Sequence, residues 1–511
     1  MLKWLLAPLG LFLCLNVEAA TWYVRPAADC ANNGDGTAYA CAASGGAAGA
    51  WRTMANVAWG VSGVNTGDTL RACSSESSPF TTADYDGGGL AVLSVDQSGV
   101  TVDGDCSASG GETMAYMTGN GTRDYGVYCA DTTTCPNQTW RNITVTSTDV
   151  RGFYIRNNLS TTGTVLFIGS GLSCNSIVGA EGNTPQCVAG FGTGGTLTNI
   201  TSNITTDDSV HWEGDNFSIS DSRLLYPGYN VSTNLGDCVQ VVNQADNAII
   251  RRVYCDHTNS ATKQCFIYGD PVDASDDNAE ISDSTCLYPE TGNISNANKL
   301  YYSSVPATQF LRNYGLGGAY GVYMLGAGST TIGNVMKGQE VRGIDVVSTV
   351  TSGTHLVANN TVSGSPTCVA IGGGTSVTTL FYNNLVANCS SAGFTKGGSS
   401  TLTQSNNRCG QSVTTCNNGG GGSSISDAGW VGGATPTSAQ GFRLSATSAA
   451  RGIGLDLNRG NIQDNGNRAF AHPPSIGAWE AASGDIATAR AAATARTAAS
   501  ARTAATARTA R

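Results

Sequence analysis

The feature that most constrains the fold is a repeat of asparagines in the C-terminal half of the chain. Asn pairs begin at Asn359, Asn383 and Asn406 at nearly equal spacing, and Asn334 and Asn313 precede them at similar steps. Each unit holds two or three short β-branched or alternating runs separated by Gly, Asn and Ser, and helical periodicity is nearly absent. A period of this length, built from short strands, predicts one coil of a parallel β-solenoid, in which equivalent residues stack about 4.8 Å apart.

The composition excludes several other architectures. Only 13% of the residues are charged, which argues against a helical bundle, and the 66 glycines show no period of three, which excludes collagen. The consensus Leu pattern of leucine-rich repeats is missing, and propellers repeat at about 40 residues or more. Asn tolerates the left-handed backbone of a corner, and its amide can bond the Asn of the next coil, so structure alone explains the repeated Asn. We therefore expect an all-β chain with a single right-handed solenoid of roughly 10–13 coils.

The cysteine content predicts disulfides. Of the 17 cysteines, Cys14 lies in the N-terminal apolar run, and the remaining even number in an exported chain favours disulfide pairing. Four pairs are close in sequence: Cys30 and Cys41, Cys129 and Cys135, Cys174 and Cys187, and Cys409 and Cys416. Earlier in the chain the repeats are longer, and their spacing places Cys238 over Cys265 and Cys255 over Cys286 in successive coils. We therefore predict two inter-coil disulfides, Cys238 with Cys265 and Cys255 with Cys286. The chain has only four His and no C-x-x-C, so a cysteine metal site is not favoured.

The two ends of the chain differ from the repeats. Residues 1–20 carry Lys3, an apolar run over 4–15 and small residues at the end, which is typical of a cleaved secretory signal rather than a membrane anchor. We expect an N-terminal cap and first coil over 21–80, with a helix at 51–61, then the β-helix over 81–424 and a closing segment over 425–480. Residues 481–511 form an Ala/Thr/Arg tail, which is either a flexible basic segment or an electrostatic attachment to an anionic surface.

Charge and hydropathy restrict the partners. The formal net charge is −10, and residues 481–511 carry five Arg and a single acidic residue, so the rest of the chain is more acidic still and a poor nucleic-acid binder. No other segment of about 20 apolar residues occurs, so we expect no transmembrane span after signal cleavage. The sequence thus indicates a secreted monomer, extracellular, periplasmic or on the cell surface, that engages a polysaccharide or cell-surface glycan.

Short motifs at both ends carry a family resemblance. They lie at Thr21–Val24, Gly34–Thr37, Trp51–Met54 and Gly67–Leu70, and at Asp464–Arg468 and Ser475–Glu480 near the other end. Over roughly 21–480, the chain resembles secreted bacterial right-handed parallel β-helix proteins of the pectate-lyase-like superfamily. The resemblance implies the fold, but because that superfamily holds lyases, hydrolases, epimerases and noncatalytic surface proteins, it does not fix an activity.

Reactive side chains are densest at 237–277, where the coils are longer and loops protrude. A polysaccharide lyase needs a base and a cation that neutralises a uronate carboxylate. We expect the catalytic groups to come from Asp237, Arg252, Asp256, His257 and Lys263. Bound Ca2+ is one alternative for a cofactor, and no cofactor is the other; the candidate Ca2+ ligands are Asp270, Asp273, Asp276 and Asp277, which could equally form a solvated acidic turn.

Other readings of the same residues stay open. A glycoside hydrolase needs two carboxylates, for which Asp207, Asp208, Asp237 and Asp256 are available. Asp237 could instead cap the start of a strand, and His257 could be an exposed turn residue. Three aromatic residues, Trp212, Tyr229 and Tyr268, could stack on sugar rings or pack in the core. The expected functions are therefore binding and cleavage of a polysaccharide by a lyase or hydrolase or, as the alternative, a noncatalytic adhesin or envelope structural protein.

Overall fold

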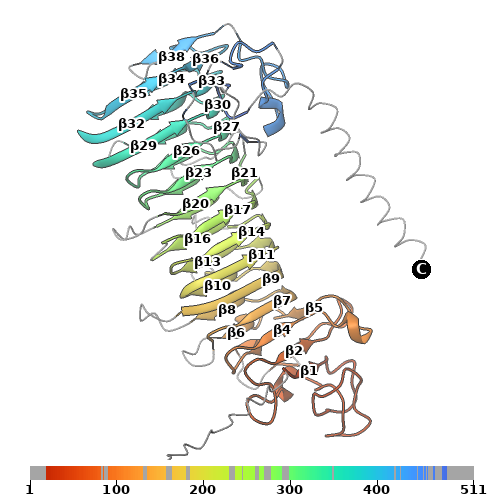
Figure 1. Ribbon diagram of the computed structural model, residues 1–511. Helices are drawn as coiled ribbons and strands as arrows, with labels where there is room; N and C mark the ends of the chain where they lie inside the picture. Colours follow the sequence, from red (N-terminus) through yellow and green to blue (C-terminus); the bar gives the residue numbers. More distant parts are fainter. Residues whose placement is uncertain are drawn as a thin grey trace, which may run out of the picture.

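The computed structural model describes residues 19–81, 84–85, 90–129, 135–156, 164–179, 184–229, 236–243, 246–258, 264–269, 278–289, 298–347, 350–418, 422–425, 427–445, 447–452, 454–455, 457, 464–465 and 475–479. These residues form a long stack of parallel strands, shown in Figure 1, which is the architecture of a parallel β-helix. The expected signal segment (residues 1–18 of it) and the basic tail lie outside the described residues. No helix among the described residues is long and apolar enough to cross a membrane.

Two sheets run the length of the stack. The first has 13 strands in the described part of the chain, one from each successive coil. They are β3 (Ala91–Ser94), β6 (Tyr125–Cys129), β8 (Arg151–Arg156), β10 (Gln186–Phe191), β13 (Val210–Glu213), β16 (Val239–Val242), β19 (Phe266–Tyr268), β22 (Lys299–Ser303), β25 (Tyr320–Met324), β28 (Arg342–Val346), β31 (Thr367–Ile371), β34 (Ala392–Lys396) and β37 (Asn417–Asn418).

The second sheet has 25 strands over the same ranges, in two parallel series that share β7 and β9. One series contains β1 (Thr21–Val24), β2 (Thr69–Ala72), β4 (Thr101–Asp103), β7 (Thr139–Thr146), β9 (Thr164–Ile177), β11 (Thr193–Thr198), β14 (Ser218–Ser220), β17 (Ile249–Arg251), β20 (Glu280–Ser282), β23 (Gln309–Leu311), β26 (Thr330–Ile332), β29 (Ser352–Ala358), β32 (Ser376–Tyr382) and β35 (Thr401–Ser405). The other series adds β5 (Ala115–Thr118), β12 (Thr201–Thr205), β15 (Arg223–Leu225), β18 (Tyr254–Asp256), β21 (Thr285–Leu287), β24 (Tyr314–Leu316), β27 (Val335–Lys337), β30 (Thr361–Ser363), β33 (Leu385–Ala387), β36 (Asn407–Cys409) and β38 (Gly422–Ser424).

A column of left-handed residues makes the corner between the two series. Its members have φ between 52° and 58°, a conformation that Asn and Asp tolerate better than most residues. They are Asn199, Asp221, Arg252, Asp283, Arg312, Asn359, Asn383 and Asn406. The first Asn of each repeated pair therefore stands at this corner, as the sequence predicted.

The second Asn of each pair forms a buried ladder. Asn334 donates from Nδ2 to Oδ1 of Asn360, Asn360 donates to Asn384, and Asn384 donates to Asn407, each at 3.0 Å. Each Oδ1 also accepts the backbone N–H of the Asn in the preceding coil, for example Asn334 N to Asn360 Oδ1 at 3.0 Å. The predicted amide stacking is confirmed, and it satisfies buried backbone groups that would otherwise cost stability.

The core lies inside the coils, where inward residues of both sheets form continuous columns. Trp140, Phe153, Trp212 and Tyr301 are completely buried among these apolar side chains. Gly190 packs against the Trp212 ring so closely that a Cβ would come within 1.9 Å of it. Large inward rings are therefore accommodated by glycine in the neighbouring strand.

Eight disulfides reinforce the described coils, and the four pairs predicted from close spacing are present. The other four join Cys73 with Cys106, Cys238 with Cys255, Cys265 with Cys286, and Cys368 with Cys389. The predicted stacking of Cys255 on Cys286 is confirmed by the strand register. The predicted inter-coil bonds are nevertheless wrong. Stacked Cβ atoms are separated by the strand spacing of about 4.8 Å and point the same way, whereas a disulfide needs Cβ atoms about 3.8 Å apart. Each sulfur instead meets one across the interior of its own coil.

The N-terminal end lacks the helix expected over 51–61. Only Met54–Asn56 forms a short 3-10 helix, because Trp51 is held in a bridge with Val24 and its ring stacks on Trp22 at 5.3 Å between centroids. At the other end, the closing segment packs beside β27 and β30, where Figure 1 shows it in dark blue. Trp430, Phe442 and Ile476 there contact the outer face of the second strand series.

Candidate functional site

The outer face of the 13-stranded sheet carries a straight column of side chains. Inward residues such as Val127 and Phe153 fill the core, so the residues that follow them point outward. In register, the outward column reads Tyr128, Tyr154, Ala189, His211, Gln240, Ile267, Tyr302, Tyr323 and Asp345. At about 4.8 Å per coil, the column from Tyr128 to Tyr323 is about 34 Å long.

A cluster of aromatic rings and arginines occupies one end of this column. Tyr154 stacks with Tyr128 at 5.6 Å and with Tyr125 at 5.1 Å between ring centroids, and it meets Phe191 edge-on at 5.6 Å. The Arg151 guanidinium lies 4.7 Å from the Tyr154 ring centroid. We call Tyr125, Tyr128, Arg151, Tyr154, Arg156 and Phe191 the tyrosine–arginine cluster.

The two arginines of this cluster have different neighbours. Arg151 donates to Gln186 Oε1 at 2.9 Å and to Thr184 Oγ1 at 3.2 Å, and Gln186 in turn donates to Asp207 Oδ2 at 3.4 Å. Arg156 is exposed, with its guanidinium 5.6 Å from the Phe191 ring centroid, and its charge helps to lower the pKa of Glu213. The face therefore presents positive charge beside flat rings, although the body of the protein is acidic.

Next in the column, His211 lies between two carboxylates. Its Nδ1 is 3.2 Å from Asp208 Oδ2 and its Nε2 is 3.1 Å from Glu213 Oε1, while Gln240 Oε1 is 2.8 Å from Nδ1. The His211 side chain is 14% exposed and that of Asp208 is 3% exposed. Burial disfavours the imidazolium, but the two carboxylates outweigh burial and raise the pKa of His211 to about 10. His211 is thus positively charged at neutral pH.

A second group of rings and cations lies further along the same face. Lys299 Nζ is 5.2 Å from the Tyr302 ring centroid and 4.9 Å from that of Tyr323. Tyr320 meets Tyr323 edge-on at 5.1 Å, and Arg342 pairs with the buried Asp345 at 2.7 Å. Rings and cations therefore recur at two places along the face, and the column between them includes the buried residues Ala189 and Ile267.

The residues predicted as catalytic are mostly committed to structure. Asp237 is buried, and its Oδ1 accepts the Gln264 N–H at 2.7 Å, so it caps the start of a strand. His257 is also buried rather than exposed in a turn; its Nε2 lies 3.1 Å from the Gln264 carbonyl, and burial lowers its pKa to about 4. Asp237 and His257 are thus brought together around the Gln264 backbone, inside the protein.

The other predicted catalytic residues lie elsewhere. Arg252 stands at the left-handed corner and forms a bidentate pair with Asp221 at 2.6 and 2.7 Å. Asp256 accepts hydrogen bonds from the Thr258 backbone and hydroxyl at 2.9 and 2.6 Å, in a local turn. Lys263 lies outside the described residues. The predicted catalytic residues that the structure describes therefore do not converge on one site.

The predicted substrate-binding aromatics also separate. Trp212 and Tyr268 point into the coil interior and are completely buried, so they pack in the core, whereas Tyr229 is 38% exposed. The four residues predicted as Ca2+ ligands, Asp270, Asp273, Asp276 and Asp277, lie outside the described residues. Within the described ranges, two clusters of three side chains of metal-binding type occur, and they consist of His257 and cysteines that are already joined in disulfides.

Sequence reasoning noted Asp208 but missed His211 and Glu213, although a signal was present. His211 and Glu213 alternate with Trp212 in one strand and therefore share a face. The pairing of Tyr128 with Tyr154 was missed because these residues belong to successive coils, and only the register brings them together.

Comparisons with known proteins add little at this site. No family model and no curated protein matches the sequence. Among solved structures, the chain is similar to the crystal structure of pectate lyase Pel9A, with 14% identity and a TM-score of 0.38 over 91% of this chain and 98% of that chain. Because identity and TM-score are this low, the function must be inferred from the side chains themselves.

Proposed function

We propose that the protein is an extracellular polysaccharide-binding β-helix whose ligand lies along the outer face of the 13-stranded sheet. The tyrosine–arginine cluster carries the proposal, because the half-buried rings of Tyr125, Tyr128 and Phe191 offer stacking surfaces and the neighbouring guanidinium groups attract anionic sugar substituents. The second group, around Lys299 and Tyr323, extends the same chemistry along the coil axis. An acidic polysaccharide is the ligand class that fits both groups.

The eight disulfides support an extracellular setting, since such bonds persist in oxidising compartments. The protonation state of His211 argues against this residue as a catalytic base. A general base must be deprotonated at working pH, and a pKa of about 10 keeps this imidazole protonated. In the proposal, His211 neutralises part of the negative charge of Asp208 and Glu213 on the binding face.

The test compares wild type with Arg151→Gln/Arg156→Gln on a panel of acidic and neutral polysaccharides, by calorimetry. We expect the acidic polymers to bind, and the double variant to weaken them at least tenfold. Arg223→Gln is the matched control, because Arg223 lies 5.6 Å over the Tyr254 ring on the other sheet. The proposed face would be refuted if the double variant and the control lose affinity equally, or if neither of them changes the affinity.

Cleavage is measured in parallel by unsaturated-product absorbance and reducing ends, with and without a chelator. Turnover of a bound polymer would identify an enzyme and replace the binding-only proposal. Lys263→Ala then separates a lyase base from other groups, because a lyase would lose turnover while keeping its affinity.

A further inference from the structure

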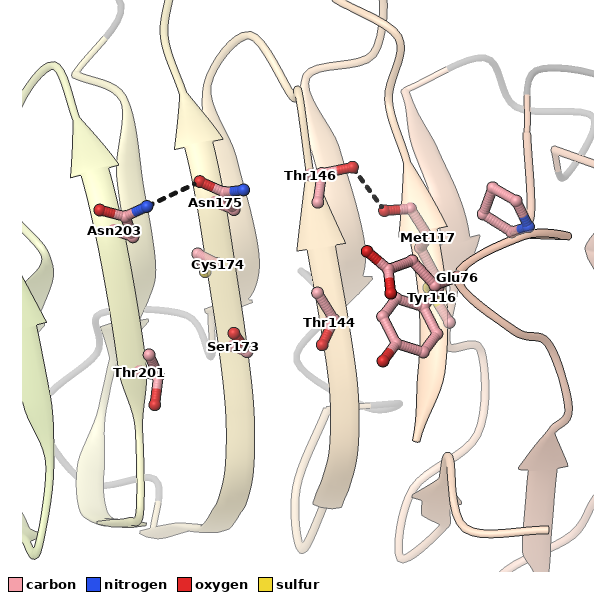
Figure 2. A pocket seen from close by; sticks show the side chains of 11 residues that line it. Glu76, Tyr116, Met117, Thr144, Thr146, Ser173, Cys174, Asn175, Thr201 and Asn203 are labelled. Atoms are coloured by element: carbon pink, nitrogen blue, oxygen red, sulfur yellow. Dashed lines mark hydrogen bonds between the residues drawn. The ribbon is translucent and has the colours of Figure 1, made fainter. Parts of the chain in front are cut away.

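A pocket lies on a different face from the proposed polysaccharide face, which is the outer face of the 13-stranded sheet. It has a volume of about 450 Å³ and opens on the outer side of β5, β7, β9 and β12, near the N-terminal end of the stack. Figure 2 shows its residues, which come from four neighbouring strands and from the chain segment after β2.

The floor consists of two columns of hydroxyl and amide side chains. The register stacks Thr144, Ser173 and Thr201 in one column. The second column contains Thr146, Asn175 and Asn203, with Asn203 Nδ2 donating to Asn175 Oδ1 at 3.1 Å. Because equivalent strand positions recur in each coil, the floor is a regular two-column array of neutral donors and acceptors.

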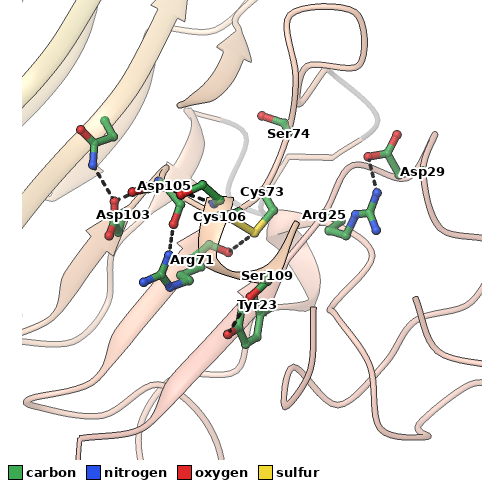
Figure 3. The surroundings of a disulfide bond; sticks show 12 residues. Tyr23, Arg25, Asp29, Arg71, Cys73, Ser74, Asp103, Asp105, Cys106 and Ser109 are labelled. Carbon is green, nitrogen blue, oxygen red and sulfur yellow. Dashed lines mark hydrogen bonds and ion pairs between the residues drawn. A yellow bond between two sulfur atoms is a disulfide. The ribbon is translucent and has the colours of Figure 1, made fainter. Parts of the chain in front are cut away.

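The wall of the pocket is tied firmly to the stack. The segment after β2 begins at Cys73, whose disulfide to Cys106 is drawn in Figure 3. Next to it, Ser74 Oγ donates to the Tyr116 carbonyl at 2.9 Å and accepts the Tyr116 N–H at 2.7 Å. Phe80 then pairs with Met117 in a parallel bridge.

This anchored turn brings Glu76 to the pocket beside Tyr116, at one end of the floor (Figure 2), and Pro79 of the same turn also lines the pocket. A wall fixed at both ends means that the pocket exists before a ligand arrives, which reduces the cost of binding.

We propose that this pocket binds a neutral saccharide. The lining residues offer hydroxyl and amide groups that can donate to and accept from sugar hydroxyls, and the Tyr116 ring offers a flat apolar surface for one sugar face. Among the described residues that line the pocket, none is a lysine or an arginine, and Glu76 is the one carboxylate. A uronate or sulfated sugar would meet Glu76 without a compensating cation from this lining, so the pocket selects against the acidic chains that suit the other face.

The proposal is tested with cello-, manno-, galacto- and xylo-hexaose as probes, and with a galacturonate hexamer as the acidic probe, by calorimetry on the full chain. Ser173→Trp fills the pocket with a ring from an outward position. Asn175→Ala/Asn203→Ala removes the amide pair without adding bulk. Thr285→Trp is the matched control, since Thr285 is an outward, half-buried residue of the same column, three coils beyond Thr201.

We expect at least one neutral hexaose to bind wild type, with a tenfold or greater loss in both pocket variants and less than a twofold change in Thr285→Trp. Arg151→Gln/Arg156→Gln should leave this binding unchanged, which separates the pocket from the proposed polysaccharide face. Unchanged thermal unfolding shows that the variants fold. The proposal is overturned if no neutral probe binds, if the control weakens binding as much as Ser173→Trp, or if the arginine variant abolishes it.

Discussion

The network around His211 makes a quantitative prediction about pH. The folded pKa is about 10, against an ordinary value of 6.5 for this side chain. A raised pKa means that folding favours the protonated form, so the stabilisation is complete below pH 6.5 and is lost as pH rises through 10. A shift of one pKa unit corresponds to about 1.4 kcal/mol, so the rise from 6.5 to about 10 stabilises the folded state by about 5 kcal/mol when His211 is protonated.

His211→Gln removes the titration while keeping a polar side chain of similar length. Wild type should be more stable than the variant at pH 6.5, and its advantage should shrink by about 1.4 kcal/mol per pH unit up to about pH 9.5. Urea unfolding followed by tryptophan fluorescence and circular dichroism gives this difference wherever the two transitions coincide. An advantage that stays constant across this range would refute the ion-pair interpretation.

A direct readout comes from NMR of the histidine side chains. The chain has four His, so selective labelling gives few signals, and His→Gln variants assign them. His211 should titrate near pH 10, whereas His257 and His355, whose pKa burial lowers to about 4, should stay neutral above pH 5. A His211 inflection near 6.5 would show that Asp208 and Glu213 do not hold the proton.

Two further predictions concern the coils. Asn360→Ala removes four hydrogen bonds inside the buried ladder and should lower the free energy of unfolding by about 4 kcal/mol at about 1 kcal/mol each, whereas Asn65→Ala at an exposed site should cost less than about 1 kcal/mol; similar urea midpoints for the two would contradict the ladder's role. Gly190→Ala should destabilise by about 1–3 kcal/mol because its methyl group overlaps the Trp212 ring, and Gly397→Ala, which meets open space, should change little; a Gly190→Ala melting temperature equal to that of Gly397→Ala would disprove the overlap.

The fold was predictable because, in a solenoid, residues at equivalent coil positions recur at nearly constant spacing in the sequence. Recurring steps of similar length placed Asn359, Asn383 and Asn406 in equivalent coil positions, and the parallel register and the left-handed corner follow from that equivalence. The spacing also stacked Cys255 on Cys286 correctly. It could not give the disulfide partners, because the bond depends on the distance across one coil, and that distance is set by core packing rather than by the repeat.

The candidate site was harder to predict, because its residues are spread over many repeats. Charge density directed attention to 237–277, yet Asp237 and His257 there are consumed by backbone hydrogen bonds around Gln264. The proposed binding face instead draws one or two side chains from each of many coils, so no local window contains a motif. Tyr128 and Tyr154 are separated by a full repeat in sequence but are register neighbours in space. On a repeat fold, function is therefore better sought by aligning coils first and then reading each outward column for chemistry.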